Sequence, residues 1–113
     1  MKAFTDISQS KKLAEILPIE SADMWFANGL VVAKTGEEPK DIKGVFPCWG
    51  LASLLDVLPT NLEIALAITD FQGDRKEKYV IGSVEHDKYD CYADNPVDAC
   101  YEMILKLNKL KLV

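Results

Sequence analysis

One cysteine lies where a reactive thiol would be expected. Cys48 follows Pro47 and precedes a leucine-rich stretch, so the pattern predicts that it opens a helix. A helix N-terminus stabilises a thiolate, which lowers the thiol pKa and makes the sulfur more reactive. His86 is the only histidine of the chain, and Asp90 and Asp94 follow it closely. Cys48, His86 and Asp90 are therefore candidates for the nucleophile, the base and the orienting carboxylate of a thiol hydrolase or acyltransferase.

The segment Pro47-Cys48-Trp49-Gly50-Leu51-Ala52 resembles the nucleophile segment of transglutaminase-like thiol enzymes, in which Cys-Trp opens a helix. The resemblance implies that Cys48 is the nucleophile and His86 the base, with Asp90 or Asp94 as the third group. The alternative is a half-buried structural cysteine that packs as a small hydrophobic side chain. We favour this alternative, because no Asn or Gln near Cys48 is an obvious oxyanion donor.

Metal and cofactor sites are not expected. Glu85, His86, Asp87 and Asp90 carry groups that bind divalent cations, but one histidine among scattered carboxylates is common on protein surfaces. The glycines are dispersed and form no phosphate-binding loop. We therefore predict no metal site and no cofactor.

Composition limits the class of protein. The 113 residues carry a net charge of −5, which argues against a nucleic-acid partner. The longest apolar run is residues 64–68, far short of a membrane span, and the first residues lack an apolar signal segment. Three cysteines without a CxxC pair indicate reduced thiols rather than disulfides or zinc, so we predict a cytoplasmic protein.

Hydrophobic periodicity predicts three helices and five strands. The first helix is capped by one of Ser8, Gln9 and Ser10 and ends at Pro18, and Asn95 caps the last helix. Asn28-Gly29 lies between two apolar runs and predicts a hairpin. The remaining elements are a helix from Pro47 or Cys48 to Leu58 and strands near residues 62–68, 79–84 and 89–93. The long connection from Thr35 to Pro47 is either functional or a surface loop.

These elements predict an α+β fold in the order αββαβββα, forming a single domain over residues 1–113. We expect a mainly antiparallel sheet of about five strands with three helices packed on one face. Residues 13–18 resemble residues 54–59, each ending in Leu-Pro before a strand. This similarity indicates either a duplicated helix–strand–strand unit or a common way to end a helix, and we favour the second explanation.

The chain also resembles a group of small bacterial proteins associated with phages and mobile elements, a group without an established activity. The resemblance lies in Pro47-Cys48-Trp49 before the leucine-rich helix, and in the segment from Ala93 to Cys100. It implies a small α+β domain and no particular chemistry.

The partly exposed sheet predicts a small cytoplasmic binding or adaptor domain that associates with itself or with a protein partner, and with neither nucleic acid nor membrane. Trp25, Phe46 and Trp49 are the candidate interaction residues, with burial in the core as the alternative. If helices cover the face that holds Met24 and Phe26, Trp25 points outward and favours self-association.

Overall fold

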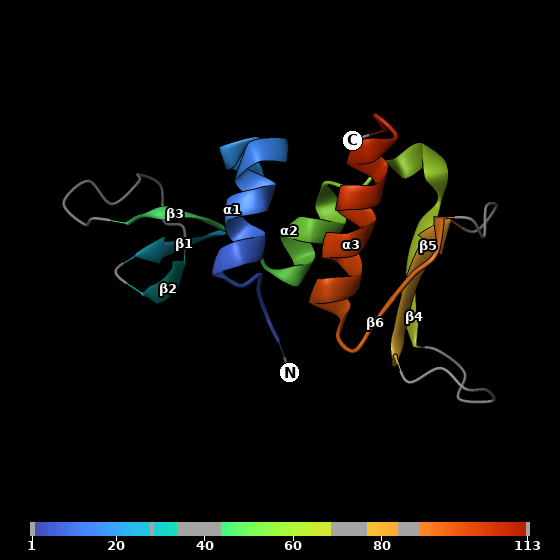
Figure 1. Cartoon of the computed structure of the whole chain (residues 1–113), viewed down its shortest axis with the longest axis horizontal. Coiled ribbons are helices and arrows are strands. Elements are labelled where there is room, and N and C mark those ends of the chain that lie inside the picture. The colour runs from blue at the N-terminus through green and yellow to red at the C-terminus, as the bar shows by residue number, and fades with distance from the viewer. Residues whose placement is uncertain (1, 28, 34–43, 69–76, 84–88, 113) are drawn as a thin grey trace. The chain divides into compact units, whose positions relative to one another are not determined.

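A computed structural model describes residues 2–27, 29–33, 44–68, 77–83 and 89–112 (Figure 1). The chain divides into two compact units. The N-terminal unit is Ala3–Asp56, and the C-terminal unit is Val57–Val113 together with Met1–Lys2. Each unit contains helices and an antiparallel three-stranded sheet, so the α+β class is confirmed.

The N-terminal unit pairs one longer helix with a small sheet. Its elements are α1 (Ile7–Ile16), the 3-10 helix η1 (Ile19–Ser21), β1 (Met24–Ala27), β2 (Leu30–Ala33), β3 (Phe46–Cys48) and α2 (Leu51–Asp56). The strand order is β2-β1-β3, and both pairings are antiparallel. Helix α1 packs against β3.

Helix α1 begins two residues earlier than the serines indicate. Asp6 is the N-cap: its carboxylate accepts from the Gln9 backbone N–H at 2.8 Å, and the Gln9 side chain accepts from the Asp6 N–H at 3.1 Å. This reciprocal capping box satisfies two amides of the first turn. The prediction of a cap among Ser8, Gln9 and Ser10 was therefore wrong, since Gln9 acts from the third helical position and Ser10 lies buried inside the helix.

The predicted hairpin is present. β1 and β2 pair with Ala27 opposite Leu30 and Met24 opposite Ala33, and the described turn residue between them is Gly29. Gly29 has a φ of +79°, a conformation that costs glycine nothing and that the turn requires.

Strand β3 was not predicted, and it corrects the position of Cys48. Phe46–Cys48 pairs with β1, and helix α2 begins only at Leu51. Pro47 does not start a helix here; it lies in an edge strand, the position in a sheet where a missing N–H is tolerated. Cys48 therefore ends a strand and has no helix N-terminus to stabilise its thiolate.

Trp25 does not point into solvent. The expected faces are correct: Phe26 lies opposite Phe46 on the face that meets Phe4, whose ring contacts that of Phe26 edge-on. Trp25 is on the other face, yet only 4% of its surface is exposed. The reason lies in the strand order, because β3 makes β1 the central strand and flanks Trp25 with Val32 and Pro47.

The C-terminal unit consists of a second small sheet and the longest helix. Its elements are the 3-10 helix η2 (Thr60–Leu62), β4 (Ile64–Ile68), β5 (Tyr79–Ser83), β6 (Cys91–Ala93) and α3 (Pro96–Lys109). The strand order is β4-β5-β6, and α3 packs against β5 and β6. The inward side of α3 is fully buried, as is Ile81 at the centre of the sheet.

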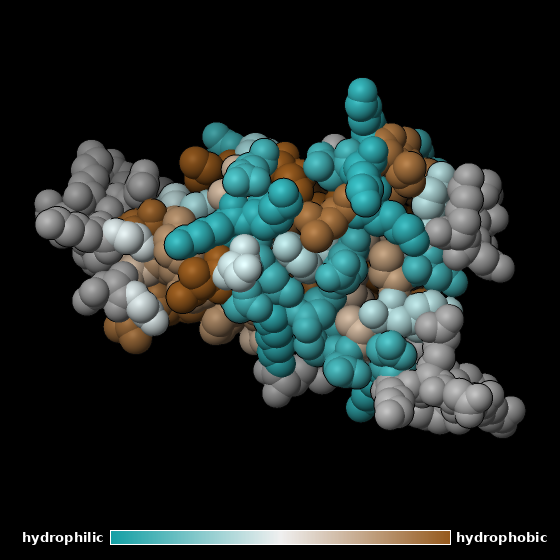
Figure 2. Space-filling view, in the orientation of Figure 1, coloured by the Kyte–Doolittle hydropathy of each residue, from teal (hydrophilic) through white to brown (hydrophobic). Residues whose placement is uncertain are grey.

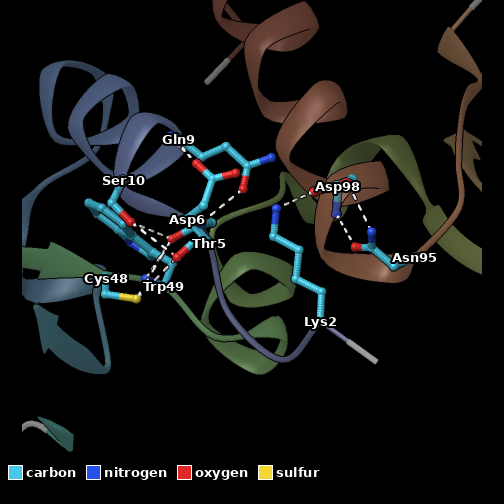
Figure 3. Close-up of polar contacts among 9 residues, drawn as sticks. All are labelled: Lys2, Thr5, Asp6, Gln9, Ser10, Cys48, Trp49, Asn95 and Asp98. Atoms are coloured by element: carbon cyan, nitrogen blue, oxygen red, sulfur yellow. Dashed lines mark hydrogen bonds and ion pairs between the residues drawn. The ribbon is translucent and has the colours of Figure 1, made fainter. Parts of the chain in front are cut away.

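The predicted cap of the last helix is confirmed. The Asn95 side chain accepts from the Asp98 N–H at 2.8 Å, and Pro96 occupies the first turn. The Asp98 carboxylate also accepts from the Asn95 amide at 2.8 Å and from the Lys2 ammonium at 2.7 Å (Figure 3). The first turn of α3 thus has a carboxylate near its positive end, and the N-terminal segment is tied to it.

The number and order of the strands differ from the prediction. The described residues contain six strands in two sheets, not about five in one, and each sheet has its own packed helix. The sequence similarity of residues 13–18 and 54–59 marks two segments with the same order of elements. In each segment a helix is followed by Leu-Pro, a 3-10 helix and three strands. The central strand is the first of three in one sheet and the second in the other, so the sheets are not topological copies.

Candidate functional site

Cys48 lies in a buried cluster of small polar groups. The cluster comprises Thr5, Ser10, Cys48 and Trp49, from the segment before α1, from α1 and from the end of β3 (Figure 3). The Thr5 hydroxyl is 2.7 Å from the Ser10 hydroxyl and 3.8 Å from the Cys48 sulfur, and it accepts from the Trp49 N–H at 3.2 Å. The Cys48 thiol donates to the Thr5 carbonyl at 3.5 Å. Each buried polar group of this cluster therefore has a partner inside the unit.

This environment holds the Cys48 thiol in its neutral form. The side chain is fully buried, and burial raises the pKa of the thiol. Hydrogen bonds from the Thr5 and Ser10 hydroxyls lower the pKa and the charge of Asp23 raises it, but both effects are smaller than that of burial. A protonated, enclosed thiol is a poor nucleophile, so the geometry favours a structural role for Cys48.

The other members of the predicted catalytic set lie outside the described residues or in the C-terminal unit. His86 lies outside the described residues, as do Glu85 and Asp87 of the candidate metal set. Asp90 belongs to the C-terminal unit, and its carboxylate packs against the backbone of Gly82. Asp94 is exposed just before α3.

The three cysteines should differ in reactivity toward a thiol probe. Burial raises the pKa of all three thiols, and that of Cys100 to about 12. Cys91 is the half-buried one, whereas Cys48 and Cys100 are fully enclosed. We expect iodoacetamide at neutral pH to modify Cys91 at least about tenfold faster than the other two, and faster still as the pH approaches 9. Peptide mapping of the labelled native protein measures this order; preferential labelling of Cys48 would restore the thiol-enzyme hypothesis.

The aromatic residues proposed as interaction anchors lie mostly in the interior. Trp49 is fully buried, and its indole N–H donates to the Ser21 hydroxyl at 3.0 Å. Trp25 is buried as described above, and Phe46 is half-buried with the Lys11 ammonium 5.5 Å from its ring centre. The Trp25 and Trp49 side chains therefore present almost no surface to a partner in this structure.

A second polar contact was missed in the sequence. The Asp23 carboxylate accepts from the Gly50 N–H at 2.8 Å and from the Ser53 hydroxyl at 3.0 Å, and so satisfies donors at the start of α2. A side chain at position 50 would meet Asp23 and Met24 at 2.9 Å, which explains the glycine there. Asp23 is far from Gly50 and Ser53 in the chain, so no local sequence pattern predicts the contact.

The exposed apolar surface of the N-terminal unit includes side chains of an edge strand of its sheet. Leu30 is 68% and Val32 39% exposed, and both lie on β2, which pairs only with β1 among the described strands. They share the face of Trp25 and Ala27, to which they are directly paired. Figure 2 shows hydrophobic side chains (brown) over this end of the N-terminal unit, around the labelled strands of Figure 1. We call the outer edge of β2 with Leu30 and Val32 the β2 edge.

The two edges of this sheet differ in chemistry. β3 carries Pro47, which has no N–H to offer a further strand. The sequence of β2 is Leu-Val-Val-Ala, without proline and without a charged residue. Proline and charged side chains are what usually prevents an edge strand from pairing with another strand. Of the two edge strands, β2 is therefore the one whose sequence carries no feature that opposes strand addition.

Two kinds of site are not found in the described part of the chain. None of its residues form a group of three or more histidine, cysteine or acidic side chains that could hold a metal ion. No described helix is long and apolar enough to cross a membrane.

A scan against protein-family models and searches of curated proteins and of solved structures found no match to this chain.

Proposed function

We propose that this chain is a small protein-binding domain that accepts an extended segment of another protein at the β2 edge. The observation that carries the proposal is an uncharged, proline-free edge strand with two exposed apolar side chains on one face. Main-chain hydrogen bonds to such an edge provide affinity, and side chains at alternate positions provide specificity. The burial of Trp25 shifts the proposed contact from the tryptophan to its neighbours on β2.

Two features support binding rather than catalysis. The thiol of Cys48 is enclosed, protonated and bonded to Thr5, which is what a structural cysteine requires. Leu30, in contrast, is the most exposed of the large hydrophobic residues described, and a partner that covers it would remove apolar surface from water. Cytoplasmic location and the resemblance to phage-associated proteins remain predictions from the sequence.

The proposal is tested with a synthetic strand. The probe is a fluorescein-labelled peptide of alternating threonine and valine, and its control is the same peptide N-methylated along the backbone, which cannot donate main-chain hydrogen bonds. Fluorescence anisotropy should show saturable binding of the first peptide only. Leu30→Lys should weaken this binding at least about tenfold, because a charge on an edge strand opposes strand addition.

The matched control variant is Ile19→Lys. Ile19 is also an exposed apolar residue of the N-terminal unit, but it lies on η1 rather than on the sheet. This variant should bind the peptide as the natural chain does. Equal binding of both peptides, or equal losses for the two lysine variants, would show that the β2 edge is not a strand-binding site.

A further inference from the structure

We propose that the last turn of α3 and the residues after it form a docking surface for an acidic, apolar segment of a partner protein. The surface comprises residues 109–112, in the order Lys-Leu-Lys-Leu, and we call it the α3 end (near the mark C in Figure 1). It belongs to the C-terminal unit and does not depend on strand addition at the β2 edge. The inference follows from the charge, the exposure and the backbone of these residues.

Positive charge is concentrated in this part of the chain. All 18 acidic residues lie before Met103, although the whole chain has a net charge of −5. The last of them, Glu102, is about two helical turns before Lys109. Among the described residues, no ion pair includes Lys109 or Lys111, and both side chains are exposed. A carboxylate of a partner can therefore pair with either ammonium group without displacing an existing ion pair.

Two apolar side chains alternate with these lysines. Leu110 is 49% and Leu112 42% exposed, whereas Leu107, one turn earlier, is fully buried. A partner that covers the two exposed leucines would remove apolar surface from water. Ammonium groups next to exposed leucines therefore fit a segment that carries both acidic and apolar side chains.

The backbone holds the α3 end in a defined conformation. The Leu112 N–H donates to the Leu107 carbonyl at 2.8 Å, and the Lys111 N–H donates to the Asn108 carbonyl at 3.0 Å. These two bonds form a Schellman motif, in which the position of Lys111 is left-handed and is usually occupied by glycine. Lys111 has a φ of +60°, a conformation that is unfavourable for lysine. A strained residue of this kind indicates a role for its side chain.

The charge of the chain favours a peptide segment over a nucleic acid or a membrane surface. Both of these present many negative charges over a wide area, and the net charge of −5 opposes their approach. A single segment can contact the α3 end alone. The attraction of Lys109 and Lys111 is then opposed less by the acidic residues of the chain.

Fluorescence anisotropy with a synthetic peptide tests the α3 end. The probe is a fluorescein-labelled peptide of alternating glutamate and leucine, and its controls replace either the glutamates by lysine or the leucines by serine. Only the first peptide should bind saturably, and its affinity should fall at least about fivefold between about 20 and 300 mM NaCl, because salt screens the ion pairs. Lys109→Gln combined with Lys111→Gln should weaken the binding at least about fivefold.

The matched control removes the same charge from the N-terminal unit. It combines Lys11→Gln with Lys12→Gln, two exposed positions on α1, and should bind the peptide as the natural chain does. Lys111→Gly separates binding from folding, because glycine suits the positive φ and lacks the ammonium group. This variant should keep or raise the midpoint of urea unfolding and still weaken binding at least about twofold.

The outcomes decide the proposal. Absence of saturable binding to the glutamate–leucine peptide would overturn it, as would equal losses for the two double variants. A Lys111→Gly variant that binds as the natural chain does would show that Lys111 is not part of the surface, and contradict the proposal. Co-sedimentation with phosphatidylserine vesicles tests the membrane alternative: binding to vesicles without binding to the peptide would replace the protein partner by a lipid surface.

Discussion

Thr5→Val should lower the free energy of unfolding by about 3 kcal/mol. Valine has nearly the shape of threonine but lacks the hydroxyl that joins Ser10 and the Trp49 N–H. The variant leaves the buried Trp49 N–H without its partner, which costs about 1–3 kcal/mol, and removes a second bond worth about 1 kcal/mol. Urea unfolding with an unchanged slope would assign the change to the folded state.

Two controls define that result. Thr60→Val makes the same chemical change at an exposed residue, and it should alter stability by less than about 0.5 kcal/mol. Ser10→Ala removes the contacts of one hydroxyl with the Thr5 hydroxyl and carbonyl, and it should have an intermediate effect, because the Trp49 N–H keeps Thr5 as its acceptor. Equal stabilities for the Thr5 and Thr60 variants would mean that the polar cluster contributes nothing to the fold of the N-terminal unit.

Gly82→Ala should destabilise the protein by about 2 kcal/mol. A methyl group at Gly82 in β5 would overlap the Asp90 carboxylate and approach the Asp90 Cα to 3.3 Å, so the Asp90 side chain and its backbone must both give way. Overpacking of this kind costs about 1–3 kcal/mol. The backbone of Gly82 does not have a positive φ, so alanine itself is compatible with the strand.

The same substitution in a chain that also carries Asp90→Ala tests whether Asp90 causes the loss of stability. With the carboxylate removed, Gly82→Ala should cost less than about 1 kcal/mol, because only the 3.3 Å approach to the backbone at position 90 remains. A double-mutant cycle followed by thermal or urea unfolding measures the coupling. A loss that is the same in both backgrounds would show that Asp90 is not the obstacle.

Local signals in the sequence predicted the local structure. Asn28-Gly29 between apolar runs predicted the hairpin, and Asn95 with Pro96 predicted the start of α3. These features depend on backbone preferences of residues that are adjacent in the chain, which is why they can be inferred without a structure. The faces of β1 followed in the same way from strict alternation.

Contacts between distant residues were not predictable in this way. β3 is three residues long and contains Pro47, so it has no strand periodicity, and it exists because β1 pairs with it. With β3 in the sheet, β1 is the central strand and Trp25 is buried. Cys48 then belongs to a strand and not to the start of a helix, as had been expected. One missed strand therefore altered both the predicted nucleophile and the predicted interaction surface.

The β2 edge could be found only after the strand order was known. The sequence shows an apolar run at Leu30–Ala33, which fits a central strand as well as an edge strand. The order β2-β1-β3 and the exposure of Leu30 and Val32 distinguish the two. The interaction surface thus follows from topology rather than from any motif.

Amide hydrogen exchange measured by NMR, at a concentration where the chain is monomeric, tests strand addition most directly. The spectra are recorded with and without the alternating threonine–valine peptide. We predict that amides of β2 (Leu30–Ala33) gain protection when the peptide is added, while those of β3 (Phe46–Cys48), the edge that carries Pro47, do not change. Unchanged protection in β2, or a gain confined to other elements, would contradict the β2 edge as the binding surface of this protein.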